Sequence, residues 1–314
     1  MDKKPEKLVP EVRFKGFTDD WEQRKLKSIS NISSGGTPNK NNKEYWNGNI
    51  FWITTSEIHY NQITKSKDTI TQLGLDNSSA KILHPGTILM AMYGQGKTRG
   101  QVGLLKTAAA TNQAVAAIVP HQIVKTNFLY SFLEKEYLHI RNYANSGSQS
   151  NLSLTIIGSQ NIIFSKNIVE QSKIGNILSN ISTLITLQQR KLEQLKQLKK
   201  ALLQQLFVDK NSKLPILRFK NFNGDWKKRK LEEIGKATGG TSIESEFSPY
   251  GSYKVINIGS YSEDHSYNDQ GIRAINSDKT QKRILNKHDL TMILNDKTST
   301  GKIIGSVLII PSDN

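Results

Sequence analysis

The sequence predicts an α+β protein in which two similar domains of mixed sheet and helices are joined by a long coiled-coil helix. Two observations carry this prediction. A segment near the N-terminus recurs in the second half of the chain, and a heptad pattern fills the stretch between the two copies. With 314 residues, the chain is also long enough for roughly two domains.

The first element is the repeat. Residues 10–29, PEVRFKGFTDDWEQRKLKSI, recur at 215–234 as PILRFKNFNGDWKKRKLEEI, and SSGGTP at 33–38 is similar to TGGTS at 238–242. A repeat this long indicates a duplicated domain, so we expect both copies to perform the same task on two parts of one target. The identical pairs include Arg13 and Arg218, Phe14 and Phe219, Phe17 and Phe222, and Trp21 and Trp226.

Within each copy, short apolar runs are typical of strands, and Gly- and Asn-rich loops separate them. If the second copy were as long as the first, it would run well past residue 314, so we expect an incomplete second domain without its own long helix. The strand candidates are 50–58, 87–93, 113–120 and 161–167 in the first copy and 254–261, 290–294 and 303–310 in the second, and an amphipathic helix is expected at 127–144.

The segment between the copies predicts a coiled-coil helix from about 169 to 207. Apolar residues recur along it in alternating steps of four and three, which is the spacing of heptad a and d positions. Gln188 and Lys199 are the polar members of this series. An ordinary core helix is the alternative, but the stretch contains no proline and exceeds the usual globular length. We therefore expect an apolar face that needs a partner helix. The predicted partner-facing residues are Ile174, Leu178, Ile181, Ile185, Leu192, Leu195, Leu202 and Leu206.

Charge and composition restrict the classes of partner and of chemistry that the chain can have. The 43 Lys and Arg against 27 Asp and Glu give a net charge of +16, which favours a polyanionic partner such as DNA, RNA or an anionic membrane surface. The sequence has no run of apolar residues long enough to span a membrane, and its first residues lack the apolar core of a signal peptide, so we expect a cytoplasmic protein. The absence of cysteine excludes disulfides, thiolate nucleophiles and Cys-bound metal.

Catalytic motifs are not apparent. GQGKT at 94–98 suggests a phosphate-binding loop, but Ala91 stands where that loop needs glycine. The sequence has no Asn-Pro-Pro-aromatic or Asp-Pro-Pro-aromatic element of a DNA amino-methyltransferase. The six histidines lack metal-ligand spacing, and the acidic residues do not form the cluster of a two-metal nuclease. We therefore expect a binding protein without a cofactor or metal.

Polar loops supply the candidate DNA-binding residues, because Arg, Lys, Asn and Gln can present paired donors or acceptors to base edges. The loops at 39–48 and 93–101, a cluster near 148–151, and the stretch at 295–302 have this composition. Ordinary solvated loops are the alternative. The predicted DNA-binding residues are Lys40, Asn41, Lys43, Tyr93, Gln95, Lys97, Thr98, Arg99, Ser148, Gln149, Lys297 and Ser299.

Taken in order, these motifs resemble the specificity subunits of type I restriction-modification systems, the HsdS family. The resemblance implies a first target recognition domain at 1–167, a conserved spacer helix at 168–210 and an incomplete second target recognition domain at 211–314. The motifs that carry it are P-x-[VL]-R-F-x-x-F-x-x-x-W at 10–21 and 215–226, SSGGTP at 33–38, TNQAVAAI at 111–118, GSQSNLSLTII at 147–157 and the helix at 174–207.

The resemblance also implies a function. In that family each recognition domain reads one half of a bipartite DNA site, and two long helices pack antiparallel to set the gap between the halves. Such subunits dock two methyltransferase subunits, which use S-adenosylmethionine to methylate adenine, and restriction subunits that use ATP. The cofactors and the catalytic activities therefore belong to the partners.

The missing second helix leaves the apolar face of the first without a partner in this sequence. This suggests that two copies of the chain pair through it. A truncated sequence or a frame-shifted gene product is the alternative. Two other functions stay open: a coiled-coil scaffold that binds protein, and an RNA-binding protein.

Overall fold

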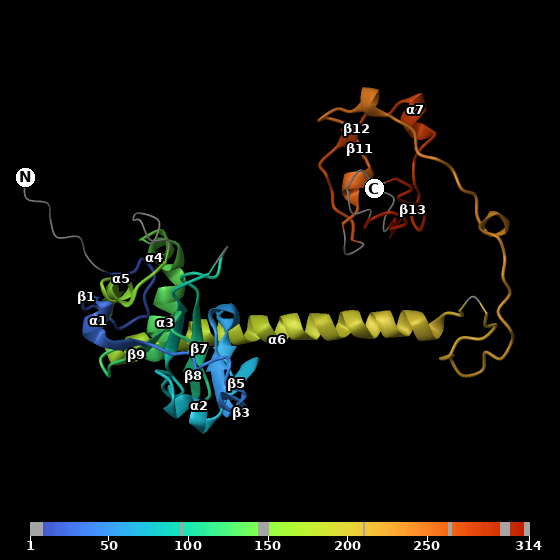
Figure 1. Cartoon of the computed structure of the whole chain (residues 1–314). Helices are drawn as coiled ribbons and strands as arrows, with labels where there is room; N and C mark the ends of the chain where they lie inside the picture. The colour runs from blue at the N-terminus through green and yellow to red at the C-terminus, as the bar shows by residue number, and fades with distance from the viewer. Residues whose placement is uncertain are drawn as a thin grey trace, which may run out of the picture. The chain divides into compact units, whose positions relative to one another are not determined.

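A computed structural model of the protein describes residues 9–94, 97–143, 151–209, 211–262, 266–295 and 302–310 (Figure 1). The chain divides into two compact units, Met1–Gln205 and Leu206–Asn314. The mixture of sheets and helices and the long helix confirm the predicted α+β class. Among the described residues, no helix is both long and apolar enough to cross a membrane.

A five-stranded sheet forms the centre of the first unit. Alternate residues of its strands enter different apolar clusters: Ile88 and Met90 pack on one face, and Leu89 and Ala91 on the other. Both faces of the sheet are therefore buried, which explains why the sequences of these strands are continuous apolar runs. In spatial order the strands are β2 (Ser30–Ser34), β9 (Val115–Pro120), β6 (Ile88–Ala91), β7 (Val102–Leu105) and β4 (Gln62–Ile63), with only β4 and β7 running parallel.

A second, three-stranded sheet packs on one of these faces. Ile53 and Ala109 from its strands join the cluster that contains Leu89 and Leu105. The central strand β3 pairs antiparallel with β5 and parallel with β8. The bounds are β3 (Trp46–Ile53), β5 (Asp68–Ile70) and β8 (Ala109–Thr111), with η1 (Lys43–Tyr45), η2 (Thr55–Glu57) and α2 (Gln72–Asp76) in the connections.

Helices cover the other face of the large sheet. The predicted helix at 127–144 is present as two helices with a turn at Glu136, and Phe128, Leu129 and Leu133 of the first are buried. The strands β1 and β10 pair antiparallel beside them. The elements are α1 (Leu26–Ile29), α3 (Thr126–Lys135), α4 (Tyr137–Tyr143), α5 (Leu154–Gly158), β1 (Glu22–Lys25) and β10 (Asn161–Phe164).

The long helix α6 (Ile168–Leu206) begins inside the first unit. Gln171 is buried, and its side chain accepts from the Lys125 N–H (2.7 Å) and donates to the carbonyls of Ile123 (3.0 Å) and Ser165 (2.8 Å). Gly175 lies so close to α3 that a Cβ would stand 2.6 Å from the Phe128 nitrogen. The first two turns of α6 are therefore fixed to the first unit. The helix is exposed along most of its remaining length.

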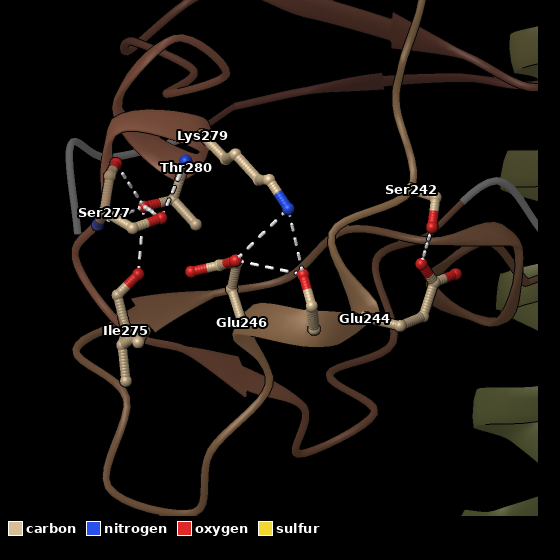
Figure 2. Close-up of polar contacts among 8 residues, drawn as sticks. Ser242, Glu244, Glu246, Ile275, Ser277, Lys279 and Thr280 are labelled. Carbon is tan, nitrogen blue, oxygen red and sulfur yellow. Dashed lines mark hydrogen bonds and ion pairs between the residues drawn. The ribbon is translucent and has the colours of Figure 1, made fainter.

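The second unit is built from short elements around a small core of Tyr261, Ile293 and Leu308. Figure 2 shows how side chains join two of them: Lys279 lies 3.6 Å from the Glu246 carboxylate and donates to Ser245 (3.3 Å). Hydrogen bonds from Ser277 and Ser245 and the charge of Lys279 lower the pKa of Glu246, so this carboxylate stays ionised. The elements are η3 (Leu231–Glu233), η4 (Glu244–Glu246), β11 (Tyr253–Lys254), η5 (Ile258–Ser260), β12 (Arg273–Ala274), α7 (Asp278–Gln281), β13 (Leu290–Met292) and β14 (Val307–Ile309).

The repeated motif has different surroundings in the two units. In the first, Trp21 packs edge-on against Phe128, with ring centroids 5.6 Å apart. In the second, Trp226 contacts Phe207 instead, and Phe219 is 75% exposed. By the spacing of the repeat, the counterpart of Phe128 would lie beyond residue 314. The motif of the second unit therefore lacks, within these 314 residues, the contacts that its first copy makes.

Candidate nucleic-acid interface

Three connecting segments meet at one end of the five-stranded sheet. β2 ends at Ser34, opposite Ala116 in β9, and β6 ends at Ala91, opposite Val115 in β9. The segment after β2, the loop between β6 and β7, and the turn before β9 therefore leave the sheet at the same place.

The turn at 111–114 connects the other two segments. Its Thr111 carbonyl accepts from the Gly36 N–H (2.8 Å), and its Ala114 carbonyl accepts from the Met92 N–H (2.9 Å). The side chain of Asn112 shapes the turn by accepting from the Ala114 N–H (3.1 Å). These backbone hydrogen bonds hold both loops in a fixed relation to the TNQA sequence.

The two glycines of SSGGTP allow this close approach. A Cβ on Gly35 would overlap the Thr111 carbonyl, and a Cβ on Gly36 would overlap Ser79. Beyond them, the Thr37 hydroxyl donates to the Gln113 side-chain carbonyl at 2.5 Å. The loop that carries Lys40, Asn41 and Lys43 therefore begins directly beside the turn.

The loop between β6 and β7 is closed at its base and held from one side. The Ala91 carbonyl accepts from the Gly100 N–H (2.8 Å), and the Ala91 N–H donates to the Gln101 carbonyl (3.0 Å). From α4, the Tyr137 hydroxyl donates to the Lys97 carbonyl (2.6 Å) and accepts from Arg141 (2.5 Å).

The Tyr137 ring lies against Gly100, which adopts a φ of +87°. It also contacts the Tyr60 ring edge-on, with centroids 5.7 Å apart. Burial, and secondarily the neighbouring Tyr137, raise the pKa of the Tyr60 hydroxyl, so Tyr60 stays neutral under ordinary conditions. The loop therefore rests on a packed aromatic support.

Most of the predicted DNA-binding residues that the structure describes are on the surface of these loops. Lys40, Asn41, Lys43 and Lys97 are exposed, Tyr93 is 43% exposed and Thr98 is half-buried. Gln95, Ser148, Gln149, Lys297 and Ser299 lie outside the described residues. The segment that follows Ser148 and Gln149 in sequence reaches the same region, because the Leu152 N–H donates to the Met92 carbonyl (3.0 Å).

Arg99 differs from the other predicted residues. Its side chain is only 9% exposed, so the guanidinium lies inside the first unit rather than on the loop surface. In this conformation Arg99 presents little surface to a base edge, and a structural role fits its burial better. Its predicted contact with DNA would require the loop to rearrange.

Comparison with known proteins identifies the family. The family model described as the type I restriction modification DNA specificity domain matches residues 18–197 and 223–313. The chain belongs to this family. The two matches begin 205 residues apart, which is also the spacing of Trp21 and Trp226.

Members of the specificity family with curated descriptions are distant relatives. The specificity subunit of the type I restriction enzyme MjaIX from Methanocaldococcus jannaschii is 27% identical over 195 residues, which cover 60% of this chain and 44% of the relative. The specificity subunit of EcoR124I/EcoR124II from Escherichia coli is 28% identical over 181 residues, which cover 55% and 43%. The chain thus spans less than half the length of these relatives.

Among solved structures, the type I restriction-modification S subunit from M. genitalium is 18% identical, with a TM-score of 0.46. That likeness covers 60% of this chain and 46% of the solved one.

Sequence reasoning missed Thr37 and Gln113 as residues of the site. Both stand inside motifs that the sequence made conspicuous, SSGGTP and TNQAVAAI, but the motifs alone did not indicate that they touch. Among the described residues of this specificity-family chain, no group of His, Asp or Glu has the arrangement of a metal site. The exposed groups of these loops are lysines, amides and hydroxyls, which bind by charge and hydrogen bonding.

Proposed function

We propose that this chain is a sequence-specific DNA-binding subunit of a type I restriction-modification complex, and that the first unit reads one half of a bipartite site. The observation that carries the proposal is the meeting of three segments at one sheet end, where Lys40, Lys43 and Lys97 are exposed. Family membership and the net charge of +16 support it.

The side chains at this end divide into two chemical groups. Lys40, Lys43 and Lys97 carry positive charge suited to phosphates, which position a protein on DNA without reading sequence. Asn41 and Gln113 carry amides, which can donate and accept at once and so distinguish base edges in the major groove. Rigid backbone connections to the turn at 111–114 would keep these amides in register with the bases.

The second unit is proposed to read the other half of the site, because it repeats the opening motif of the first. Lys297 and Ser299 are its predicted DNA-binding residues. The 39 residues of α6 would then set the gap between the two half-sites. A spacer of this kind acts by its length, since a helix is stiff over a few tens of ångströms.

The proposed partners are duplex DNA, two methyltransferase subunits and restriction subunits. In this assignment the chain itself is not an enzyme, and the adenine methylation and DNA cleavage are carried out by the partners. The chain would act in the cytoplasm. We further propose that α6 is a docking surface for the methyltransferase subunits as well as a spacer.

A second copy of the chain is the proposed partner of the apolar face of α6. The apolar heptad residues from Leu178 to Leu195 are 41–54% exposed, and Leu202 and Leu206 are half-buried. Removing several such side chains from water contributes about 25 cal/mol per Å², enough to favour association. Ile174 is not fully available, because it packs partly against the core of the first unit.

Selection from a randomised duplex DNA library tests the main proposal. We expect the 314-residue chain to enrich a two-part motif with a fixed gap, or a palindromic motif if two first units act together. Competition by single-stranded RNA and by random duplex DNA serves as the control. Equal affinity for all duplexes, or a preference for RNA, would contradict the proposal.

The same chain coexpressed with a methyltransferase subunit in a host without DNA methylation gives an independent readout. A new methylated motif that matches the selected one would tie the DNA-binding specificity to the complex. Methylation at a motif unrelated to the selected one would contradict the assignment of specificity to this chain.

A further inference from the structure

The two units contain the same local frame, although the sequence repeat fades before it. In the first unit the short turn η1 is followed by Trp46, which pairs antiparallel with Ile70. In the second unit the short turn η4 is followed by Phe247, which pairs antiparallel with Ala274. The 205-residue spacing of the repeat would instead match Trp46 with Gly251, so the sequence alone does not reveal this equivalence.

Backbone hydrogen bonds extend the equivalence to the end of each turn. In the first unit the carbonyl of Tyr45, the last residue of η1, accepts from the Thr71 N–H (3.0 Å). In the second unit the carbonyl of Glu246, the last residue of η4, accepts from the Ile275 N–H (3.0 Å). Each turn is therefore attached in the same way to the residue that follows the paired position of the neighbouring strand.

The chain after each turn follows the same path. Ile70 pairs a second time with Ile50, and Ala274 pairs a second time with Tyr253, so the intervening residues loop out in both units. One glycine of each looped-out segment lies against the paired residue so closely that it leaves no room for a Cβ. These glycines are Gly48 and Gly251. The two turns therefore occupy equivalent places in two frames of the same construction.

The two frames present different side chains. Glu244 is the first residue of η4 and takes the place of Lys43 in η1, and both side chains are exposed. The loop before the turn is also shorter in the second unit, because five residues (38–42) follow GGT at 35–37 and two (242–243) follow GGT at 239–241. A carboxylate thus stands where the first unit has a predicted DNA-binding lysine.

The two carboxylates of η4 have different surroundings. In Figure 2 the Glu246 side chain points towards Lys279, at 3.6 Å, and it also accepts from the Ser245 hydroxyl (2.9 Å). The Glu244 side chain lies on the other side of the turn, beside Ser242, whose hydroxyl donates to it. Glu246 therefore holds the turn in its frame, and Glu244 is the carboxylate that the turn presents to solvent.

We propose that η4 is a DNA-reading turn of the second unit and that Glu244 reads a cytosine there. This deepens the DNA-binding function proposed above and rests on it. A carboxylate only accepts hydrogen bonds, so it needs a base edge that offers a donor. In the major groove, cytosine offers its N4 amino group, whereas adenine places the acceptor N7 beside its amino group, and guanine and thymine offer acceptors only.

The negative charge distinguishes base reading from phosphate binding at this position. A carboxylate repels phosphates, so Glu244 opposes binding to DNA in general and is compensated only where a base offers an amino group. Lys43 attracts the phosphates of every duplex. Neutral side chains at these two equivalent positions should therefore change the affinity for random DNA in opposite directions.

Two matched variants test the proposal, because Lys43→Gln and Glu244→Gln introduce the same side chain at equivalent positions. Each variant and the unchanged chain select from a randomised duplex DNA library. We expect Glu244→Gln to reduce the preference for cytosine at one position of one half-site about five- to a hundredfold and to shift it towards adenine, whose amino group and N7 an amide can bind together. The other half-site should not change. Affinity for random duplexes should rise for Glu244→Gln and fall for Lys43→Gln.

Glu232→Gln is the control for the loss of charge. Glu232 is an exposed carboxylate of η3, where it pairs with Lys230 (3.2 Å), so its substitution removes the same charge outside the turn. This variant should select the same motif as the unchanged chain. Chemical denaturation checks that Glu244→Gln still folds, and we expect no change in its midpoint because the side chain is exposed.

The outcomes separate this inference from the function on which it rests. A two-part motif that Glu244→Gln leaves unchanged would overturn the role of Glu244 and leave the DNA-binding function standing. Weaker binding of this variant to all duplexes would overturn it as well. An unchanged motif with a loss of methylation in cells would assign η4 to a protein contact instead. If the unchanged chain selects no DNA sequence, the proposed function fails and this inference fails with it.

Discussion

The Arg13 guanidinium binds the Glu170 carboxylate through two hydrogen bonds, Nε to Oε1 at 2.6 Å and Nη2 to Oε2 at 2.9 Å. This pair joins the first repeated motif to the first turn of α6. Lys173 strengthens the connection, because its ammonium lies over the rings of Phe14 (5.8 Å) and Phe17 (5.2 Å). The repeated motif thus acts in the first unit as an anchor for the base of the long helix.

Arg13→Ala should destabilise the first unit, because it leaves the fully buried Glu170 carboxylate without its cationic partner. We expect the midpoint of thermal unfolding to fall by several degrees. Arg218→Ala is the matched control from the second copy of the motif and should have a smaller effect. Equal shifts for the two variants would contradict the anchoring role of the first motif.

The same pair predicts a pH dependence. The hydrogen bond with Arg13 lowers the pKa of Glu170 below its ordinary value of 4.5, so the ionised carboxylate stabilises the folded state. This contribution is fully present above pH 4.5 and is lost as the pH falls through the lower folded pKa. Glu170→Gln should therefore be less stable than the unchanged chain at pH 7, and the difference in unfolding midpoint should narrow below pH 4.5. A constant difference would reject this linkage.

Tyr137→Phe should loosen the loop between β6 and β7, because it removes the hydroxyl that donates to the Lys97 carbonyl and keeps the ring against Gly100. We expect amide hydrogen exchange at 97–101 to rise about two- to tenfold, which corresponds to one lost hydrogen bond. We also expect the variant to discriminate less between target and random DNA, because the loop is held less firmly. Tyr143→Phe, on the same helix but in contact with His139, is the control and should change neither.

Gln113→Ala and Lys97→Ala should separate base reading from phosphate binding. Loss of the Gln113 amide is expected to cost about 1–3 kcal/mol on target DNA and little on random duplexes. Loss of Lys97 should weaken both equally and reduce the slope of log affinity against log salt by about one. Binding isotherms at several salt concentrations measure both effects. The reverse pattern would exchange the two roles.

Gly35→Ala should disturb the contact between SSGGTP and the turn at 111–114, since the added methyl group overlaps the Thr111 carbonyl. We expect a loss of about 1–3 kcal/mol in the free energy of unfolding. Gly239→Ala, its counterpart in the second unit, meets open space among the described residues and should be nearly neutral. Chemical denaturation of the two variants provides the comparison.

The long helix could be predicted within one residue at each end, because its four-three spacing is unbroken and no proline interrupts it. Strand β1 could not be predicted. Its sequence EQRK has no apolar alternation, and it becomes a strand only by pairing with β10, more than a hundred residues away. Tertiary pairing decides the structure of such a segment, and local sequence contains no signal for it.

The same limit applies to the candidate site. The composition of the loops indicated Lys40 and Lys97, but their common location follows from the strand order, in which β9 lies between β2 and β6. Periodicity does not determine that order, so the contact between Thr37 and Gln113 could not be foreseen. Nor could loop composition reveal that Arg99 turns inward.

A small change at Gly175 would be amplified along α6. Because Gly175 has no side chain, the helix rests directly on α3, and a larger residue would force α6 or α3 to shift at this contact. The arm from Gly175 to Leu206 is about 46 Å long at 1.5 Å per residue. A tilt of about 5° would thus move the far end by about 4 Å, slightly more than the roughly 3.4 Å rise of one base pair. We therefore expect a methyl group at Gly175 to displace the far end of the helix sideways by about the rise of one base pair, without changing the length of the helix.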